Sequence, residues 1–511
     1  MTKELQFTDL SVSAGEQSLL SEARGALRAG ELVAVVGRSG SGKTLLTKAI
    51  MGLLPDQLRA EGQILLDGQR LDQLSDKEMD AVRGGRISML FQQPKRVMNP
   101  RMTIRAHLLE AMGAHGWGKA KAHETQILSL LEEVGLSPAK DIAAKRPDQL
   151  SGGMAQRAML AIALAGDPEF ILADEPTSSL DSILKAEVLQ LLRHKQQERG
   201  VGVLFITHDI ASIQHIADRV VVVSAGQIVD QCPTAQLFSK DRHAKTRELI
   251  EASLPIIRSP RAGDSVCLLE AAGASKNYTR RAKGKAALNP TTLRLHSGQV
   301  LGVVGRSGSG KSTFARLLAG LEQPTTGQII NQHDDVPTQV QIIAQEPFSS
   351  FDPRLTIRTS MSAAVHRLSE ADGRERMKQA VTQVGLPEEL LDRRPSQCSG
   401  GQLQRLAIAR ALLTEPQVLI CDESTSALDS VAQRHILDLL LELRDKMGLS
   451  LVVISHDMDV IRYVSDNVAV FFEGELVEHR RLTDFLNAPL HQHSQDLVAA
   501  LDATSAVRKV S

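Results

Sequence analysis

The stretch GRSGSGKT spans residues 37–44, and the nearly identical stretch GRSGSGKS spans residues 305–312. Each lies between an apolar run typical of a buried strand and a pattern typical of a helix. Glycines in such a loop let backbone N–H groups converge on phosphate oxygens, and the helix N-terminus adds its dipole. We therefore expect two phosphate-binding loops, formed by Gly37, Arg38, Ser39, Gly40, Ser41, Gly42, Lys43 and Thr44 and by Gly305, Arg306, Ser307, Gly308, Ser309, Gly310, Lys311 and Ser312.

The whole chain is an internal repeat. Three further motifs occur twice, namely LSGGMAQR at 150–157 and CSGGQLQR at 398–405, ILADEPTSSLD at 171–181 and LICDESTSALD at 419–429, and FITHD at 205–209 and VISHD at 453–457. The second copy is shorter only ahead of its SGG motif, which is what duplicated domains show when their loops drift. We expect a first domain at residues 1–253, a short linker at 254–264 and a second domain at 265–511.

Composition fits a soluble pair of domains. Apolar residues make up 42% of the 511 residues, and 59 Lys and Arg nearly balance 60 Asp and Glu. A nucleic-acid binder would show a clustered basic excess, so we expect no nucleic-acid partner. The N-terminus lacks a secretory pattern, the apolar runs are too short to span a bilayer, and the four cysteines occur singly. We expect a cytoplasmic chain whose membrane parts, if any, belong to other subunits.

Each copy reads as an α/β domain. In the first copy, apolar runs at 32–36, 87–91, 170–173 and 203–206 predict buried strands, and helical patterns separate them. Leading segments and a hairpin pattern at 220–231 predict an added antiparallel portion. The stretch 99–149 is mostly helical in pattern and predicts a helical insertion. Ligands of such folds bind outside the carboxyl ends of the parallel strands.

A pair of carboxylates ends an apolar run in each copy. Asp174 and Glu175 follow FILA, and Asp422 and Glu423 follow VLIC. A carboxylate that faces a phosphate loop can hold the water shell of Mg²⁺, and its neighbour can act as general base on the attacking water. A lone strand-end Asp-Glu pair is a weak signal, but here it follows a phosphate loop in both copies.

Two SGG motifs precede helical runs. A serine N-cap followed by glycines offers free N–H groups and a hydroxyl, which makes a second anion-binding helix end. Taken alone this would be an ordinary helix start. The residues concerned are Ser151, Gly152, Gly153 and Met154 in the first copy and Ser399, Gly400, Gly401 and Gln402 in the second.

The combined motifs resemble those of the ATP-binding-cassette (ABC) ATPases over essentially the whole chain. The resemblance implies two tandem P-loop NTPase domains, each with a RecA-like α/β core, an antiparallel β portion and an inserted helical subdomain. It also implies that ATP binds between one domain's phosphate loop and the other domain's SGG helix. Site one would then combine Lys43, Thr44, Gln92, Asp174, Glu175 and His208 with residues 399–402, and site two Lys311, Ser312, Gln345, Asp422, Glu423 and His456 with residues 151–154.

The resemblance also implies roles within those sites. Glu175 and Glu423 would be general bases, and His208 and His456 would contact the γ-phosphate of ATP. The expected Mg²⁺ ligands, direct or through water, are Thr44, Gln92, Asp174, Ser312, Gln345 and Asp422.

Adenine recognition is expected to differ between the copies. An aromatic residue ahead of the phosphate loop stacks on adenine in this family. Aligning ASKNY at 274–278 with LSVSA at 10–14 gives Tyr278 that role in the second copy and leaves Ala14 in the first.

Three branches of the family carry two cassettes on one chain. Ribosome-binding ABC-F factors would need a long charged helical linker in place of residues 254–264, and excision-repair ATPases would need zinc-binding cysteine pairs. An importer motor remains, and QQPKRVMNPRMTI at 92–104 and QEPFSSFDPRLTI at 345–357 resemble the peptide, nickel and opine importers. The resemblance implies a peripheral ATPase on the cytoplasmic face of a bacterial inner membrane.

The implied partners are two integral membrane permeases and, through them, an extracytoplasmic substrate-binding protein. The segments after Gln92 and Gln345, leading into 99–149 and 353–397, are expected to form the docking surface for the permeases. Cargo is less determined. The chain lacks the iron–sulfur cysteine cluster of many peptide importers, which favours nickel or a metal–opine complex over a di- or oligopeptide.

Overall fold

The computed structural model describes residues 3–114, 123–178, 180–253, 266–278, 286–331, 339–426 and 428–505. The chain divides into two compact units, one with residues 1–254 and 503–511 and one with residues 255–502. The linker predicted at 254–264 lies outside the described residues. Each unit is described by itself below.

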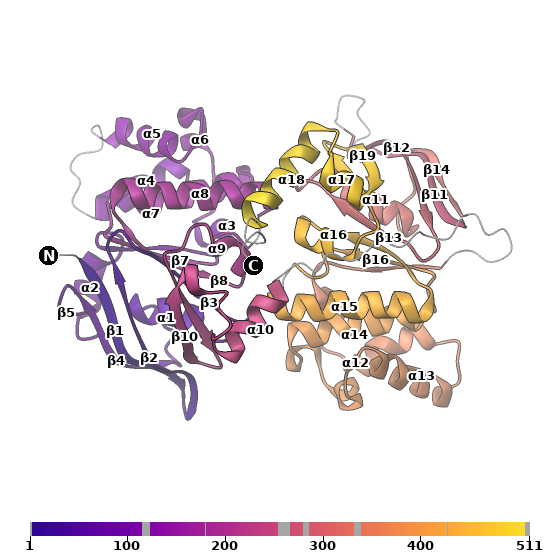
Figure 1. The fold of residues 1–511 in the computed structure, drawn as a ribbon, viewed down its shortest axis with the longest axis horizontal. Helices are drawn as coiled ribbons and strands as arrows, with labels where there is room; N and C mark the ends of the chain where they lie inside the picture. Colours follow the sequence, from indigo (N-terminus) through magenta and orange to yellow (C-terminus); the bar gives the residue numbers. More distant parts are fainter. Residues whose placement is uncertain are drawn as a thin grey trace. The chain divides into compact units, whose positions relative to one another are not determined.

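A six-stranded sheet forms the centre of the first unit, and Figure 1 labels its strands β10, β3, β8 and β7. The full order is β10-β9-β3-β8-β7-β6. All neighbouring pairs are parallel except β9 and β10, which form an antiparallel hairpin. Every residue of β3 is buried, as expected for a strand covered on both faces. The strands are β3 (Leu32–Val36), β6 (Ile87–Leu90), β7 (Phe170–Asp174), β8 (Gly202–Thr207), β9 (Arg219–Ser224) and β10 (Gln227–Pro233).

An antiparallel sheet covers one face of this central sheet. Its order is β2-β1-β4-β5, with β1 (Glu4–Ala14), β2 (Gln17–Arg28), β4 (Arg59–Leu66) and β5 (Gln69–Arg70). Leu5 and Phe7 of β1 share one core with Val33 and Val35 of β3 and with Leu46 of helix α1 (Lys43–Ile50). Leu5 and Phe7 are two residues apart on β1, so their side chains lie on the same face of its sheet, and the same holds for Val33 and Val35 on β3. These two faces pack against each other.

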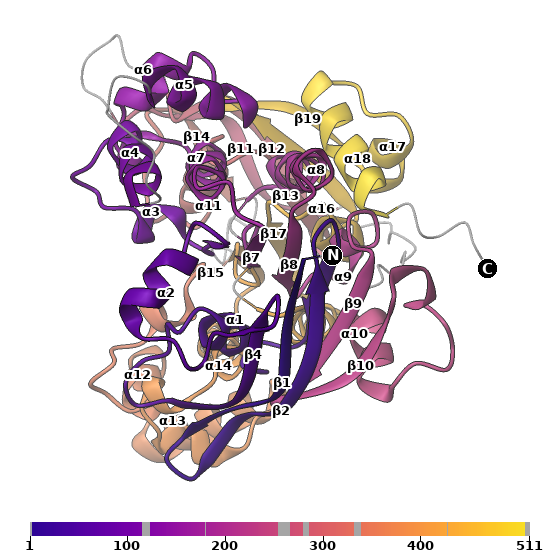
Figure 2. The same ribbon diagram turned by 90° about the vertical axis from the view of Figure 1, so that its left-hand side faces the viewer.

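Two long helices run beside each other in the first unit, α7 (Gly152–Leu164) and α8 (Ser182–Arg199), and Figure 2 shows both nearly end-on. Ser151 and Asp181 cap them, each accepting a hydrogen bond from a first-turn N–H. The inserted helices α4 (Ile104–Ala114), α5 (His123–Glu133) and α6 (Ala139–Ala144) confirm the helical pattern predicted at 99–149. The remaining short helices are α2 (Asp76–Val82), α3 (Pro94–Val97), η1 (Pro147–Gln149), α9 (Ile210–Ile213), η2 (Thr234–Gln236) and α10 (Ala244–Ser253).

The second unit repeats this plan. Its central sheet has the order β15-β16-β17-β13-β18-β19, with only β19 antiparallel to its neighbour. Its second sheet has the order β12-β11-β14. The strands are β11 (Cys267–Lys276), β12 (Leu288–His296), β13 (Val300–Val304), β14 (Thr326–Asn331), β15 (Val340–Ile343), β16 (Val418–Asp422), β17 (Ser450–Ile454), β18 (Asn467–Phe472) and β19 (Glu475–Arg481).

The helices of the second unit follow the same order as those of the first. They are α11 (Lys311–Leu318), η3 (Pro347–Ser350), α12 (Ile357–Ser362), η4 (Ala363–Val365), α13 (Glu370–Gln383), η5 (Glu388–Asp392), η6 (Pro395–Gln397), α14 (Gly400–Leu412), α15 (Ser430–Met447), α16 (Met458–Val464), α17 (Leu482–Asn487) and α18 (Gln492–Ser505). The two sheet systems confirm the predicted α/β class with tandem domains. Helix α2 has no counterpart between β14 and β15 in the described part of the second unit, where the sequence is shorter.

Candidate nucleotide sites

The loop between β3 and α1 encloses its own lysine. The ammonium of Lys43 donates hydrogen bonds to the carbonyl oxygens of Gly37 and Arg38, both at 2.9 Å. Gly42 precedes the helix with φ 102°, a left-handed conformation that favours glycine. The Lys43 ammonium therefore lies at the centre of the loop, and the N-terminus of α1 behind it has no side-chain cap.

Two features of the loop fit a phosphate group. The hydroxyl of Ser41 is buried and has no hydrogen-bond partner within the described structure. A Cβ atom at Gly37 would lie 2.1 Å from the carbonyl oxygen of Val223, so no larger residue fits there. A buried, unpaired hydroxyl beside a lysine and a helix N-terminus is a donor set that phosphate oxygens would satisfy.

The end of β7 brings Asp174 to this loop. The Thr44 hydroxyl donates to the Asp174 carboxylate at 3.0 Å, although 130 positions separate the two residues. Burial raises the pKa of Asp174, and the Thr44 hydroxyl and nearby lysines offset this only in part. A hydroxyl and a buried carboxylate side by side are oxygen ligands of the kind that Mg²⁺ prefers.

Glu175 sits at the turn after β7, where its backbone has φ 45° and its N–H donates to the carbonyl of Ile206. The Gln92 amide donates to its carboxylate at 3.1 Å, and His208 Nδ1 lies 3.4 Å from the other carboxylate oxygen. Burial acts to raise the pKa of Glu175, but His208 and Lys43 outweigh it and hold that pKa below its usual value. Glu175 is thus poised as a carboxylate between two polar side chains.

The second unit builds the same arrangement. Lys311 donates to the carbonyls of Gly305 and Arg306 at 2.7 and 2.9 Å. Ser309 matches Ser41 as a buried hydroxyl without a partner among the described residues. A Cβ at Gly305 would lie 2.1 Å from the carbonyl oxygen of Phe471.

The carboxylates of the second unit also repeat the first. The Ser312 hydroxyl donates to Asp422 at 3.2 Å, and the Gln345 amide donates to Glu423 at 2.9 Å. His456 Nδ1 lies 3.4 Å from Glu423 and lowers the pKa of that carboxyl. Burial acts to lower the pKa of His456, but the Glu423 carboxylate outweighs it and raises that pKa.

The SGG helices α7 and α14 begin with different caps. Ser151 and Ser399 each accept a hydrogen bond from the backbone N–H three residues on, at 3.3 Å. Gln402 also reaches back to accept the N–H of Ser399 at 2.9 Å, which completes a capping box. Met154 has no polar group for this contact, so the N–H of Ser151 lacks that partner.

Tyr278 follows the end of β11, and the residue is 54% exposed. Its hydroxyl donates to the Glu322 carboxylate at 2.7 Å, and Lys276 Nζ lies 5.4 Å from the ring centroid. Ala14 ends β1 in the first unit and is half-buried. The unequal adenine recognition predicted from these two residues stays a prediction.

One supporting residue was missed by the sequence reasoning. Asp209, next to His208, accepts a hydrogen bond from the Ser212 N–H, which caps α9, and it also pairs with Lys185 of α8. Burial acts to raise the pKa of Asp209, but Lys185 and Ser212 outweigh it and hold that pKa far below its usual value. The backbone next to His208 is therefore held in place by the contacts of Asp209 with Ser212 and Lys185. The recurring His-Asp pair in FITHD and VISHD was the signal that could have revealed it.

The comparisons agree with this geometry. The family model described as ABC transporter matches residues 20–178 and again residues 288–426. The chain therefore belongs to the ABC transporter ATPases, and it is an ATP-binding enzyme of that class.

Individual relatives match nearly the whole chain. A protein of Escherichia coli strain K12 named uncharacterized ABC transporter ATP-binding protein YejF is 36% identical, covering 93% of this chain and 94% of the relative. The peptidoglycan transport ATP-binding protein YejF of Agrobacterium fabrum is 35% identical, over 93% and 91% of the two chains. The glutathione import ATP-binding protein GsiA of Salmonella typhimurium is 34% identical, over 93% and 85%.

Solved structures support the fold. An archaeal ribosome recycling factor, crystallised with a ribosomal stalk protein, matches with TM-score 0.63 and 23% identity over 92% of this chain and 90% of that one. A structure titled RNase-L Inhibitor matches with TM-score 0.63 and 21% identity over 94% and 92%. Such low identity speaks for shared architecture alone.

Within the described part of the chain, no helix has the length and apolar character needed to cross a membrane.

Proposed function

We propose that this chain is the ATP-hydrolysing motor of a bacterial ABC importer in the peptide, nickel and opine group. One observation supports it above the others. In each unit a lysine, a hydroxyl–aspartate pair and a glutamate held by a glutamine and a histidine gather beside one phosphate loop. These side chains can neutralise phosphate charge, hold Mg²⁺ and position the attacking water, as phosphoryl transfer to water requires.

The proposed chemistry divides among these residues. Lys43 and Lys311, now bonded to backbone carbonyls, would turn to the β- and γ-phosphates of ATP. Thr44 with Asp174, and Ser312 with Asp422, would hold Mg²⁺, which supplies charge neutralisation when bound. Glu175 and Glu423 would accept a proton from the attacking water, since the lowered pKa keeps each in the basic form.

The two sites are proposed to be shared between the domains. Each SGG helix, capped by Ser151 or Ser399, would place its N-terminus against the γ-phosphate held by the other domain's loop. His208 and His456 would contact the same phosphate, and Gln92 and Gln345 would orient Mg²⁺ and water. A helix N-terminus is well suited to this because its N–H groups are unpaired and its dipole favours anions.

Partners follow from the importer assignment. We propose two integral membrane permeases and, through them, an extracytoplasmic substrate-binding protein, which places the chain at the cytoplasmic face of the membrane. The docking surface would be formed by the segments after Gln92 and Gln345 that lead into 99–149 and 353–397. Two relatives carry names of glutathione import and peptidoglycan transport, which supports a small peptide as cargo. Nickel or a metal–opine complex, favoured by the missing cysteine cluster, is the second candidate.

A paired experiment tests function and cargo. Purified chain should hydrolyse ATP, and Lys43→Ala with Lys311→Ala should remove that activity. A deletion strain should lose uptake of labelled glutathione or dipeptide and regain it with the wild-type chain. Loss of nickel uptake instead would favour the metal cargo. Copurification with ribosomes, and no transport defect, would overturn the importer in favour of a ribosome-binding ATPase.

A further inference from the structure

We infer that the two ATP sites obtain a positive charge behind the γ-phosphate by different means, from Lys185 in the first unit and from a protonated His456 in the second. ATP turnover at the second site then falls as pH rises, whereas turnover at the first site does not. The inference rests on the γ-phosphate contacts proposed above for His208 and His456. It adds Lys185 as a positioning residue, which acts on the first site through Asp209.

The first unit pairs the aspartate beside its site histidine with a lysine. Lys185 lies in the first turn of α8 and forms an ion pair with Asp209, the residue that follows His208. The side chains of Lys185 and Asp209 are only 24% and 22% exposed, so solvent screens this pair less than it screens a surface ion pair. The negative charge of Asp209 is therefore balanced locally by a lysine.

The second unit has no lysine at the matching position. The two copies align without a gap from the Asp-Glu motif to the His-Asp motif, which places Gln433 at the position of Lys185 and Asp457 at that of Asp209. The Gln433 amide donates to the Thr425 hydroxyl at 3.4 Å. Asp457 caps α16 by accepting the N–H of Asp459 at 2.9 Å. The second unit thus keeps the aspartate and replaces the lysine charge by a neutral amide.

The charged residues near this amide have partners of their own. Arg434, the next residue on α15, lies 4.0 Å from the ring centroid of Tyr463, and its Nε lies 3.4 Å from Asp438. Asp459 is paired with Arg462 at 2.7 Å. Because each of these charges is balanced within its own pair, the difference between the units at the aspartate is one positive charge.

His456 can supply the missing charge. Among the described residues, the ionisable groups that act on it are Glu423 after β16, Asp457 at the start of α16 and Lys311 of α11. Burial acts to lower the pKa of His456, but the two carboxylates outweigh burial and Lys311 and raise that pKa. Two carboxylates and one lysine therefore favour a proton on the ring, which balances the charge of the group.

The first unit reaches the same balance without a proton. Glu175 and Asp209 lie next to His208, and Lys43 and Lys185 act on these two carboxylates. A lysine stays charged over the pH range in which a histidine titrates. As pH rises through the raised pKa of the second-site histidine, the second site loses its positive charge and the first site keeps its own.

The pH dependence of ATP turnover tests this difference. Steady-state turnover of the purified full chain is measured from about pH 6 to about pH 9, where histidine titrates and lysine does not. Gln433→Lys gives the second site a lysine, and Lys185→Gln leaves both sites without one. ATP and Mg²⁺ titrate identically in every sample, so the profiles are compared with one another.

The expected order of steepness follows from the number of sites that depend on a histidine proton. At the alkaline end, turnover of Lys185→Gln should be about fivefold below that of Gln433→Lys, because hydrogen bonds from charged donors are stronger than those from neutral donors. Wild type, with one site of each kind, should lie between them. If Lys185→Gln does not fold, the comparison of Gln433→Lys with wild type decides alone.

Two controls separate charge from packing. Lys185→Arg keeps the charge and should keep the wild-type pH dependence. Lys185→Gln combined with Gln433→Lys exchanges the residues of the two units and should restore the wild-type pH dependence, since one site of each kind remains. A lysine that only anchored α8 to α9 would not be replaced by a lysine in the other unit.

The remaining outcomes overturn the inference. Equal pH dependence in wild type, Gln433→Lys and Lys185→Gln does so, as does a steeper profile for Gln433→Lys. A Lys185→Arg profile that matches that of Lys185→Gln also overturns it, because the charge is then not the cause. None of these results touches the importer function, which is decided separately by uptake in the deletion strain.

Discussion

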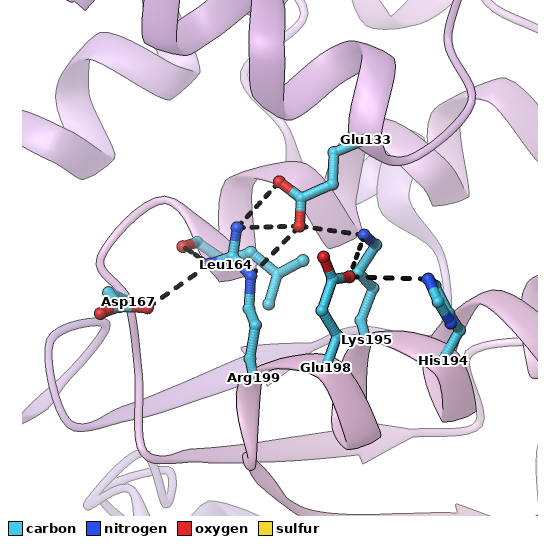
Figure 3. Close-up of polar contacts among 7 residues, drawn as sticks. All are labelled: Glu133, Leu164, Asp167, His194, Lys195, Glu198 and Arg199. Carbon is cyan, nitrogen blue, oxygen red and sulfur yellow. Dashed lines mark hydrogen bonds and ion pairs between the residues drawn. The ribbon is translucent and has the colours of Figure 1, made fainter.

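The first unit joins its inserted helices to helix α8 through charges, whereas the second unit has neutral side chains at the matching positions. Figure 3 shows the cluster in the first unit, where Arg199 and Lys195 of α8 converge on Glu133 at the end of α5. Arg199 Nη2 lies 2.9 Å from each Glu133 oxygen, and Lys195 Nζ lies 3.2 Å from one of them.

The cluster extends beyond this pair of contacts. Arg199 also reaches the carbonyl of Leu164 and the carboxylate of Asp167, and Glu198 bridges Lys195 and His194. The second unit has Gln383, Leu443 and Met447 in place of Glu133, Lys195 and Arg199, and Leu443 is buried.

The contacts around Glu175 and Glu423 show no such divergence. The histidine–glutamate distance is 3.4 Å in both units, and the glutamine–glutamate bonds differ by only 0.2 Å, at 3.1 and 2.9 Å. Phosphoryl transfer depends on the positions of these groups, which is consistent with the matching distances in the two units. The helix junction has only to be stable, and an ion cluster and an apolar contact can serve that end at similar free energy.

The largest expected effect tests the chemical equivalence of the units. Glu175→Gln with Glu423→Gln should reduce ATP turnover by about 10²–10⁴-fold, the usual cost of losing a general base. ATP affinity, measured by titration calorimetry, should be retained. The two single substitutions should lower ATP turnover by similar factors. Residual activity of the double variant above about a tenth of wild type would refute the assignment.

A smaller effect is expected at the helix junction. Glu133→Gln removes one of the two carboxylates paired with Lys195, whose side chain is only 6% exposed, and also a carboxylate paired with Arg199. We expect local destabilisation of about 1–3 kcal/mol, seen as faster hydrogen exchange in α5. Glu133→Gln with Lys195→Leu and Arg199→Met introduces the residues that the second unit has at these positions. This triple variant should recover most of the lost local stability.

The control for the junction lies in the second unit. Gln383→Ala, at an exposed position, should change the stability of α13 by less than about 0.5 kcal/mol. If the triple variant of the first unit exchanges as fast as Glu133→Gln alone, the two junctions are not interchangeable and the comparison fails.

Adenine recognition should differ by about tenfold between the sites, because stacking on an aromatic contributes roughly 1–3 kcal/mol. Tyr278→Ala should weaken ATP binding at the site of the second phosphate loop, and Ala14→Tyr should strengthen binding at the first. Titration calorimetry of Lys43→Ala and Lys311→Ala, each leaving one intact site, measures the difference. Equal ATP affinities at the two sites would show that Tyr278 does not stack on adenine and has only a structural role, in its hydrogen bond to Glu322.

The smallest effect concerns a buried carboxylate ahead of α18. Burial acts to raise the pKa of Glu478, but Ser494 and the N–H groups of His491 and Leu490 outweigh it and lower that pKa. A lowered carboxyl pKa adds stability above its unfolded value near 4.5, and that stability is lost as pH falls through the folded value.

Glu478→Gln should therefore cost about 1 kcal/mol at neutral pH, because one acceptor oxygen remains. The difference from wild type in urea unfolding should shrink below pH 4.5. In the first unit, Asp230 occupies the position of Glu478 and accepts a hydrogen bond from the N–H of His243 at 3.1 Å. Asp230→Asn is therefore the matched control variant. A difference that stays constant down to pH 3 would show that the contribution is not electrostatic.

The sequence by itself determined the repeat, the phosphate loops and the strands that precede them. The run LVAVV at residues 32–36 is β3 with the predicted bounds, and the runs predicted at 87–91, 170–173 and 203–206 are β6, β7 and β8 with ends that differ by at most one residue. A strand buried on both faces needs only local apolar residues. The glycine spacing of the loop likewise depends on local backbone geometry, as at Gly42.

Only the tertiary structure decided which side chains meet. The bond from Thr44 to Asp174 spans 130 positions, and the contacts of Arg199 with Glu133 span 66. The buried hydroxyl of Ser41 and the anchoring of Asp209 by Lys185 also depend on packing between separate elements. Periodicity reports which face of an element is buried, but not which distant residue lies against it, because that choice is made by the packing of whole helices and sheets.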